Sequence, residues 1–283
     1  MYVFIYLSRN DRRQTMQQDI ISSMIIKNIK SIEELHQVHE LESTVWSPED
    51  TVPISHTAAT IKNGGFILGA FYEEQLIGFQ YSFPGFDGIK PYLVSHSLGI
   101  HPDFRKLGIG EKLKHEQRAL AMKIGYDLIS WTYDPLETVN GNLNLHKLGA
   151  TCTAYIENAY GEMTDGMNDG LSTDRFVVEW AVKEVKRGSK NYEISKLPLL
   201  INVEFQDGSL IPGDINLEEN SDALLVPVPG NFQEIKRMNF NTAILWREKT
   251  KQVFTHYLKH GWVVTDLVKD PQKKSQYMYL LEK

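Results

Sequence analysis

The chain has 283 residues, of which 42% are hydrophobic and 23% are charged, and its formal net charge is −6. This is the composition of a folded globular protein, and it excludes a collagen, a coiled-coil rod and a mostly disordered chain. The acidic balance argues against the basic surface of a nucleic-acid-binding protein, and no apolar run approaches the roughly 18 residues that would span a bilayer. A single cysteine, Cys152, excludes an internal disulfide and fits a reducing, cytoplasmic location.

Residues 1–23 open with a short apolar stretch that is followed, rather than preceded, by basic residues. A secretory signal has the opposite order and a longer apolar part. We therefore expect a disordered extension over 1–23, with the fold starting at Met24.

From Met24 onward the pattern alternates between strand-like and helix-like segments. Ser31 and Glu34 have the spacing of a capping box, which predicts that a helix begins there. Gly149 suits a left-handed cap at the end of another predicted helix. In chain order we expect strands at 24–30, 66–72, 76–83, 91–100, 127–132, 151–157 and 175–183, and helices from 31, at 108–125 and at 136–148.

The charged segment 183–198 lacks apolar periodicity and is interpreted as a linker. The segments predicted beyond it are strands at 199–205, 223–227, 262–268 and 276–282 and a helix at 242–260. The helix–glycine–strand order around Gly149 recurs around Gly261, which hints at a degenerate half-copy. We thus predict a first domain over 24–186 and a smaller α/β domain over 190–283.

The most informative segment is the turn between the strand at 91–100 and the helix that follows. Its residues Arg105 to Gly110 combine two glycines with two basic side chains. Free N–H groups at a helix start, close backbone approach at glycine and positive charge all suit a diphosphate. The spacing is not that of a P-loop, and Leu113 replaces the third glycine of the dinucleotide fingerprint. The alternative is a glycine-rich turn with basic neighbours by chance.

Arg105, Gly108 and Gly110 fill the pattern Gln/Arg-x-x-Gly-x-Gly/Ala, and the sequence here resembles the GNAT superfamily of N-acyltransferases. The order of elements from Met24 to about Lys183 also fits that fold, an α/β protein with a mixed sheet. Segments 131–150 and 170–180 are similar to a subfamily of predicted acyltransferases with an extra C-terminal domain. The resemblance then covers most of the chain.

The resemblance implies acetyl-CoA or another acyl-CoA as the acyl donor, with no metal. The implied contacts to the diphosphate are the side chain of Arg105 and the main chain of Lys106, Leu107, Gly108, Ile109, Gly110 and Glu111. The pantetheine arm would pair with the strand edge at Leu98, Gly99 and Ile100. Gly99 marks a bulge or a close ligand approach, or is a packing glycine. Asn140 either bonds the pantetheine amides or caps its helix.

Acyl transfer from a thioester to an amine needs a base for the amine proton. His96 is the candidate, because some enzymes of this family carry their base at the matching position; the alternative is a packed or surface histidine. Many enzymes of the family use a tyrosine as general acid, and the matching position in this sequence is Leu145. Tyr133, Tyr155 or Tyr160 could replace it, and we take Tyr133 as the candidate.

Candidates for the acceptor pocket are Trp46, His56, Trp131, Tyr133 and Asp134. Arg175 could clamp a carboxylate or form a surface ion pair. We predict an N-acyltransferase that moves an acetyl or other short acyl group, with succinyl as one option, to a primary amine of a small molecule such as an amino acid, by direct attack in a ternary complex. Neither a nucleic acid nor a membrane is expected as a partner, while a homodimer is allowed. The alternative is a non-catalytic acyl-CoA-binding regulatory module.

Overall fold

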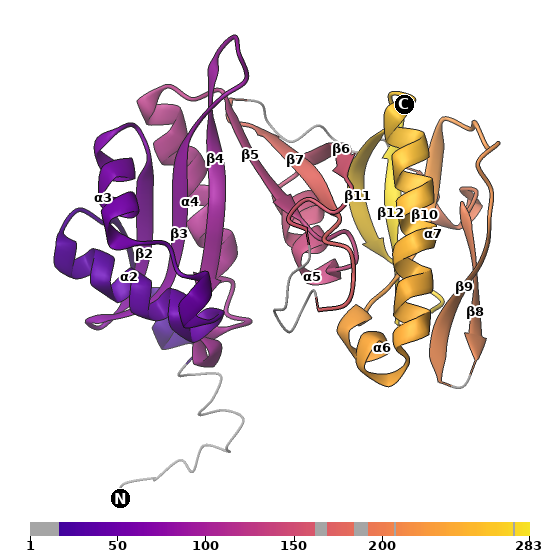
Figure 1. The fold of residues 1–283 in the computed structure, drawn as a ribbon, viewed down its shortest axis with the longest axis horizontal. Coiled ribbons are helices and arrows are strands. Elements are labelled where there is room, and N and C mark those ends of the chain that lie inside the picture. The colour runs from indigo at the N-terminus through magenta and orange to yellow at the C-terminus, as the bar shows by residue number, and fades with distance from the viewer. Residues whose placement is uncertain (1–16, 162–168, 184–191, 207, 274) are drawn as a thin grey trace, which may run out of the picture. The chain divides into compact units, whose positions relative to one another are not determined.

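The computed structural model describes residues 17–161, 169–183, 192–206, 208–273 and 275–283 (Figure 1). The chain divides into two compact units, unit 1 (Met1–Ile129) and unit 2 (Ser130–Lys283). The division falls inside strand β5 (Leu128–Tyr133). The domain boundary expected near 186–190 lies outside the described residues, so the domains over 24–186 and 190–283 stay a prediction.

Unit 1 contains four antiparallel strands in the order β1-β2-β3-β4. The strands are β1 (Ile25–Asn28), β2 (Phe66–Tyr72), β3 (Gln75–Phe86) and β4 (Pro91–Ile100). The hairpin expected between β2 and β3 is confirmed, with Glu73 in a left-handed conformation at its tip (φ 54°). This sheet carries β4, the strand that leads to the glycine-rich turn.

Helices of unit 1 cover both faces of its sheet. They are α2 (Ile32–Val45), α3 (Ile54–Lys62) and α4 (Ile109–Ile124). Tyr81 of β3 meets Thr60 of α3, whereas its neighbour Ser82 meets Gln117 of α4. Because successive side chains of a strand point to opposite faces, α3 and α4 lie on opposite sides of β3.

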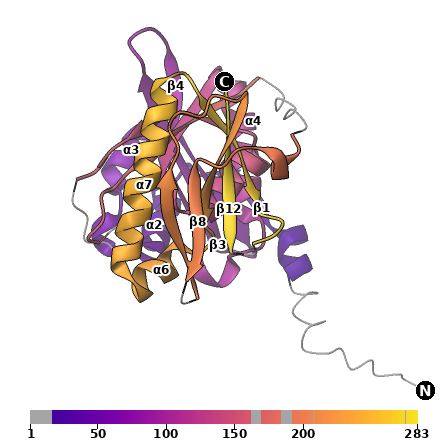
Figure 2. The ribbon, with the colours of Figure 1, turned by 90° about the vertical axis from the view of Figure 1, so that its right-hand side faces the viewer.

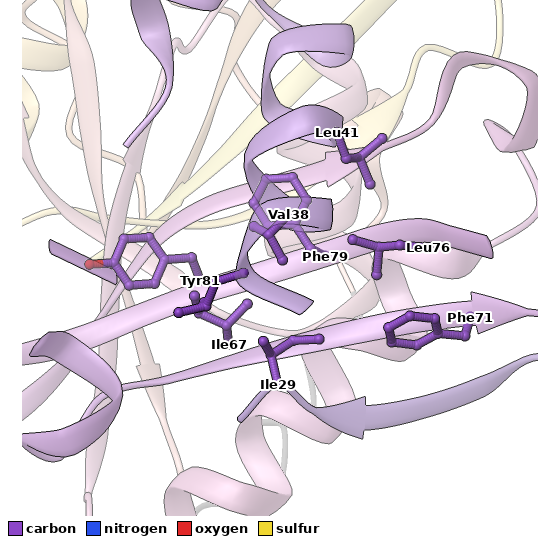
Figure 3. Close-up of a cluster of buried hydrophobic side chains, with 9 residues drawn as sticks. Ile29, Val38, Leu41, Ile67, Phe71, Leu76, Phe79 and Tyr81 are labelled. Atoms are coloured by element: carbon purple, nitrogen blue, oxygen red, sulfur yellow. The ribbon is translucent and has the colours of Figure 1, made fainter. Parts of the chain in front are cut away.

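Helix α2 begins with the predicted capping box, which is confirmed, and its apolar side packs against the sheet to form a core. Ser31 Oγ accepts from the Glu34 N–H at 3.1 Å, and the Glu34 carboxylate accepts from the Ser31 N–H at 3.1 Å. Figure 3 shows the apolar side chains of α2, β2 and β3 pointing toward one another. The buried members of this core are Ile29, Leu35, Val38, Leu41, Ile67, Phe71, Leu76, Phe79 and Tyr81.

The segment before β1 differs from the expectation. Residues 17–23 are helical, and Ile20 is buried. Asp19 accepts a hydrogen bond from the Tyr72 hydroxyl at 2.9 Å, and Lys112 Nζ donates to the Ile21 carbonyl at 3.2 Å. The predicted disordered extension is therefore wrong for residues 17–23, because this segment is helical, buries Ile20 and hydrogen-bonds to Tyr72 and Lys112; residues 1–16 lie outside the described residues.

Unit 2 holds a sheet in the order β5-β7-β6-β11-β12-β10 and a separate hairpin, β8-β9. The long helix α7 (Phe240–Lys259) packs against β6, β9 and β10 (Figure 2). The other elements are β6 (Thr151–Ile156), β7 (Arg175–Ala181), β8 (Ile201–Gln206), β9 (Ser209–Ile215), β10 (Ala223–Pro229), β11 (Val263–Lys269), β12 (Gln276–Glu282), α5 (Thr138–Gly141) and α6 (Phe232–Met238).

The strand order of unit 2 is symmetric about its middle. The sequence β5-β7-β6 on one side is mirrored by β10-β12-β11 on the other, and β6 and β11 pair antiparallel where Cys152 meets Val264. In each half a strand is followed by helix and then by two antiparallel strands. This is the order that the expected half-copy would have, although the origin of the second half stays a prediction.

The helix expected over 136–148 is interrupted. Only Thr138–Gly141 is α-helical, and Asn142–Lys147 is a π-helix in which the Leu148 N–H bonds the Leu143 carbonyl at 3.0 Å. Gly149 follows in the expected left-handed conformation (φ 71°). Within the described ranges, no helix is long and apolar enough to cross a membrane, and no group of three or more potential ligands is placed to hold a metal ion.

Candidate active site

The glycine-rich turn has the backbone that an anion requires. Gly108 caps α4 in a left-handed conformation (φ 76°), and Lys106 before it is also left-handed (φ 68°). The first backbone bond of the helix runs from the Lys112 N–H to the Gly108 carbonyl at 3.2 Å. The N–H groups of the three residues before Lys112 therefore have no acceptor within the helix.

Space beside this helix start is open. A Cβ placed on Gly108 would meet nothing within 4 Å, and one on Gly110 would meet only Leu98 Cδ2, at 3.5 Å. Arg105 and Lys106 are exposed next to it, and Arg105 Nε donates to the Ile100 carbonyl at 3.3 Å. Backbone N–H groups without an acceptor in the helix, the positive end of a helix of 16 residues and two basic side chains together fit a diphosphate.

Strand β4 reaches this turn in regular register. Leu98, Gly99 and Ile100 pair with Gln80, Phe79 and Gly78. A Cβ on Gly99 would lie 2.4 Å from the Phe79 ring, so the packing explanation for this glycine holds and the bulge considered there is absent.

The bulge of β4 lies instead at His96. Tyr81 pairs with Ser97 and Ser82 pairs with Ser95, which leaves His96 as the extra residue. The His96 ring meets the rings of Tyr81 (centroids 5.4 Å apart) and Phe83 (5.6 Å), on the sheet face that α3 covers. Ser97, opposite Tyr81, has a buried hydroxyl without a hydrogen-bond partner in the described residues.

His96 is suited to accept a proton. Desolvation by the surrounding groups, followed by the charge of His56, lowers its pKa. An imidazole with a lowered pKa is neutral at pH 7 and has a free nitrogen lone pair.

Several further polar side chains gather around Tyr81, and we refer to Glu42, His56, Thr60, Tyr81 and His96 as the Tyr81 cluster. Tyr81 Oη lies 2.8 Å from Thr60 Oγ1 and 3.3 Å from His56 Nδ1. Glu42 is buried and accepts from the Val52 N–H at 3.1 Å; burial raises its pKa to about 7. Desolvation, with a smaller contribution from the Glu42 charge, raises the pKa of Tyr81.

Trp46, one turn beyond Glu42, exposes 44% of its surface and meets Phe79 edge-on with ring centroids 6.0 Å apart. The structure thus places the predicted acceptor residues Trp46 and His56 on the same sheet face as His96, all within unit 1.

A buried polar network fixes the other face of the bulge. Lys114 Nζ donates to Ser95 Oγ at 3.0 Å, and Gln117 Nε2 donates to Ser82 Oγ at 2.9 Å. Ser82 Oγ in turn donates to Gln80 Oε1 at 2.9 Å. Burial lowers the pKa of Lys114. These bonds tie α4 to both strands at the register shift.

The remaining predicted residues belong to unit 2. Tyr133 is buried and donates to the Tyr279 hydroxyl at 3.3 Å, and Tyr279 donates to the Pro135 carbonyl at 2.7 Å. Burial raises the pKa of the Tyr133 phenol. Trp131 is half-buried and packs edge-on against Trp180, while Asn140 is exposed at the end of α5.

Asp134 and Arg175 are brought together by a third residue, Arg247 of α7. Arg247 Nη1 donates to Asp134 Oδ1 at 2.8 Å, and its Nη2 bonds Oδ2. Arg175 Nη1 lies 3.9 Å from Asp134 Oδ2 and donates to the Asp174 carbonyl at 2.9 Å. Both oxygens of Asp134 are thus engaged, and its role in substrate binding, like that of Arg175, stays a prediction.

Comparison with known families gives one match. Residues 32–150 match the model of the Acetyltransferase (GNAT) family. This part of the chain is therefore similar to GNAT acetyltransferases, and it includes the glycine-rich turn, β4 and the whole Tyr81 cluster.

Solved structures that are similar to this chain match a little more than half of its length. The yncA protein of Salmonella typhimurium, solved with acetyl-CoA, is 18% identical over 58% of this chain and 97% of that chain, with a TM-score of 0.48. The ribosomal-protein-S18-alanine N-acetyltransferase of Escherichia coli is 13% identical over 60% and 99%, with a TM-score of 0.46. Aminoglycoside 6′-acetyltransferase type Ii is 19% identical over 57% and 99%, also at 0.46. No curated protein matches the sequence.

Several residues of the site, Thr60 of the Tyr81 cluster among them, escaped sequence reasoning. Glu42 and Tyr81 lie in apolar periodic segments, where a polar residue every second or fourth position is ordinary. Ser97 becomes notable only once the bulge at His96 is known. Arg247 is 113 residues from Asp134, and no local pattern links the two.

Proposed function

We propose that the protein is an acyl-CoA-dependent N-acyltransferase whose acceptor is a primary amine of a small molecule. One observation carries this proposal: strand β4, which bears His96 on its bulge, is followed by the glycine-rich turn and a helix start with open space beside it. An acyl-CoA and an amine together require a base and an anion site, and this segment offers a candidate for each.

Acetyl-CoA is the co-substrate typical of the GNAT family, and the residues present fit its diphosphate. The N–H groups of Ile109, Gly110 and Glu111 would hold the diphosphate oxygens, with Arg105 and Lys106 supplying charge. The edge of β4 from Leu98 to Ile100 would pair with the pantetheine amides. Acetyl or another short acyl group, such as succinyl, would be transferred.

The chemistry assigned to this chain is proton removal and charge stabilisation. The amine nitrogen attacks the thioester carbon, the C–N bond forms, the C–S bond breaks, and CoA leaves as a thiolate that is protonated from solvent. His96 takes a proton from the attacking nitrogen, and a main-chain N–H near Leu98 or Gly99 stabilises the oxyanion. A thiol with a pKa of about 8.5, by analogy with cysteine, leaves without a dedicated acid. Tyr133 is therefore not required as an acid, and its hydroxyl already has a partner in Tyr279.

An amino acid is the acceptor we favour among small amines. Its amine would suit the polar, aromatic surroundings of Trp46 and the Tyr81 cluster. Arg175 remains the candidate from the sequence for binding a carboxylate. Trp131 and Asp134 remain candidates for the acceptor pocket, and Asn140 for the pantetheine.

The diphosphate site is tested by two substitutions at one position. Gly110→Ala adds a methyl group that meets only Leu98, and it improves helix propensity by about 1 kcal/mol, so folding and CoA affinity should be retained. Gly110→Asp suits a helix start equally well but places a carboxylate among the same N–H groups. We expect calorimetry to show a dissociation constant for acetyl-CoA that is at least tenfold larger in Gly110→Asp, and unchanged in Gly110→Ala. Equal affinities in both variants would refute the site.

A second candidate function is favoured by one observation. Leu145 occupies the position at which many enzymes of the family have a tyrosine as general acid; it is fully buried and cannot donate a proton. A non-catalytic acyl-CoA-binding module would bind acetyl-CoA yet release no CoA thiol with any amine. A panel of amino acids and alkylamines, with thiol release as readout, separates the two functions: turnover that collapses in His96→Ala while acetyl-CoA affinity persists identifies the enzyme.

A further inference from the structure

Two histidines of the Tyr81 cluster come from different elements and face the same side of the sheet. His96 stands on the β4 bulge and His56 on the first turn of α3, and both side chains are exposed. They are close enough for the charge of one to act on the other. The proposed reaction uses only His96 in a proton transfer, so His56 has so far only a place among the acceptor-pocket candidates.

His56 is held more firmly than an exposed side chain usually is. Its Nδ1 lies 3.3 Å from Tyr81 Oη, which itself lies 2.8 Å from Thr60 Oγ1. Tyr81 and Thr60 are both buried, so their positions are set by the core. The imidazole is thereby oriented with Nδ1 toward the protein and Nε2 away from Tyr81.

This arrangement allows His56 to change its charge without rearrangement. When the Tyr81 hydroxyl donates to Thr60, its oxygen is free to accept from His56 Nδ1–H. That bond exists in the neutral imidazole with the proton on Nδ1 and equally in the imidazolium. Proton gain and loss then occur at Nε2 alone, while the Tyr81 contact stays in place.

The proposed reaction has a need for such a group. A primary amine arrives at pH 7 as an ammonium, R–NH₃⁺, and leaves as an amide nitrogen with one hydrogen. Two protons are thus lost: R–NH₃⁺ plus R′–CO–S–CoA gives R′–CO–NH–R, CoA–SH and H⁺. One proton ends on sulfur and the other in solvent, and a single imidazole cannot hold both at once.

We propose that His56 is the second proton acceptor of this site: its Nε2 takes the first proton from the arriving ammonium and releases it to solvent, and His96 takes the second as the C–N bond forms. This inference rests on the proposed function. The order follows from the bulge, which places His96 on the strand that leads to the proposed diphosphate site, whereas His56 lies on the separate helix α3. Tyr81 and Thr60 act as positioning residues.

The titratable groups facing His56 come from each element packed against α3. They are Glu42 from α2, Tyr81 from β3 and His96 from the adjacent β4, while β2 carries no titratable residue before Tyr72. Substitutions at His56 and Tyr81 are therefore compared with one at His36, an exposed histidine of α2 outside the cluster.

The test is the pH dependence of kcat/KM for the amine, at saturating acetyl-CoA, from about pH 6 to about pH 9.5. His56→Gln should lower kcat/KM at least tenfold at neutral pH, and the loss should shrink to less than threefold at the alkaline end, where the amine is already neutral. Tyr81→Phe should show the same trend with a smaller loss, and His36→Gln none. His96→Gln should lose activity at every pH, and acetyl-CoA affinity should be unchanged in all four variants.

Three outcomes would overturn the proposal. A loss in His56→Gln that is the same at every pH would indicate a structural role, and wild-type activity in this variant would show that His56 takes no proton. Both results leave the proposed function intact, because wild-type turnover is measured alongside. Absence of wild-type turnover with every amine would overturn the proposed function and this inference together.

Discussion

Glu42 makes the stability of unit 1 depend on pH in a direction opposite to that of a paired carboxylate. Its pKa is raised from 4.5 to about 7 because burial disfavours the charge, and the hydrogen bond from the Val52 N–H offsets only part of this effect. The sign follows from linkage: the folded state binds the proton more tightly, so its stabilisation is complete below about pH 4.5 and is lost as the pH rises to about 7.

The magnitude follows from the shift. A difference of about 2.5 units at 1.36 kcal/mol each gives about 3 kcal/mol of folding free energy lost between about pH 4.5 and about pH 8. Glu42→Gln removes this loss and keeps an oxygen that can accept from Val52, but its amide N–H₂ must find a partner, at about 1 kcal/mol. We therefore expect the variant to be about 2 kcal/mol more stable than the wild type at about pH 8 and no more stable below about pH 4.5.

Urea unfolding at a series of pH values measures the difference. Trp46 is the single tryptophan of residues 1–129 and lies one turn from Glu42, so its fluorescence, compared with far-UV circular dichroism, reports on unit 1. Glu40→Gln, which changes an exposed carboxyl of the same helix, is the matched control and should follow the wild type throughout. If Glu42→Gln and the wild type had parallel pH profiles, or if the variant were less stable at alkaline pH, Glu42 would be stabilised as an anion and the reasoning would fail.

Two further substitutions test the packing of the site. Gly99→Ala brings a methyl group to within 2.4 Å of the Phe79 ring, which is fully buried. We expect the free energy of unfolding, measured by thermal unfolding, to fall by about 1–3 kcal/mol and to recover when Phe79→Leu is added. If adding Phe79→Leu did not restore stability, this clash would be excluded as the cause. Arg247→Ala leaves Asp134 buried without its bidentate partner and should destabilise unit 2 by about 3–5 kcal/mol in urea, whereas Lys196→Ala, in an exposed ion pair, should change stability by less than about 1 kcal/mol; similar effects in both would contradict the buried pair.

Local signals in the sequence were sufficient for the glycine turn before α4 and for the elements around it. The capping box at Ser31 and the glycine turn before α4 each lie within a few residues, so their geometry is set by nearest neighbours. Strand β12 spans Gln276–Glu282, as predicted, because its apolar residues and flanking polar turn are equally local.

Other elements escaped prediction for identifiable reasons. Helix α3 begins after Pro53 without a side-chain cap, so no start signal precedes it. Strand β9 contains Pro212 and Gly213, which are unfavourable within strands and are tolerated here in a two-stranded hairpin. The bulge at His96 depends on the register between β3 and β4, and register is decided by which side chains reach the core rather than by the β4 sequence alone.

The two faces of β4 divide the work of the site. On one face, Ser95 is tied through Lys114 to α4, the helix whose start is proposed to hold the diphosphate. On the other face, the neighbouring His96 contacts the Tyr81 ring, and the Tyr81 hydroxyl contacts His56, the second residue proposed to accept a proton from the amine. A bulge is what allows this, since it lets the strand bend and re-aim one side chain while the pairing on both sides continues. The buried network around Ser82 and Ser95 holds the register shift in place, so the distance between His96 and the start of α4 is set by the core of unit 1.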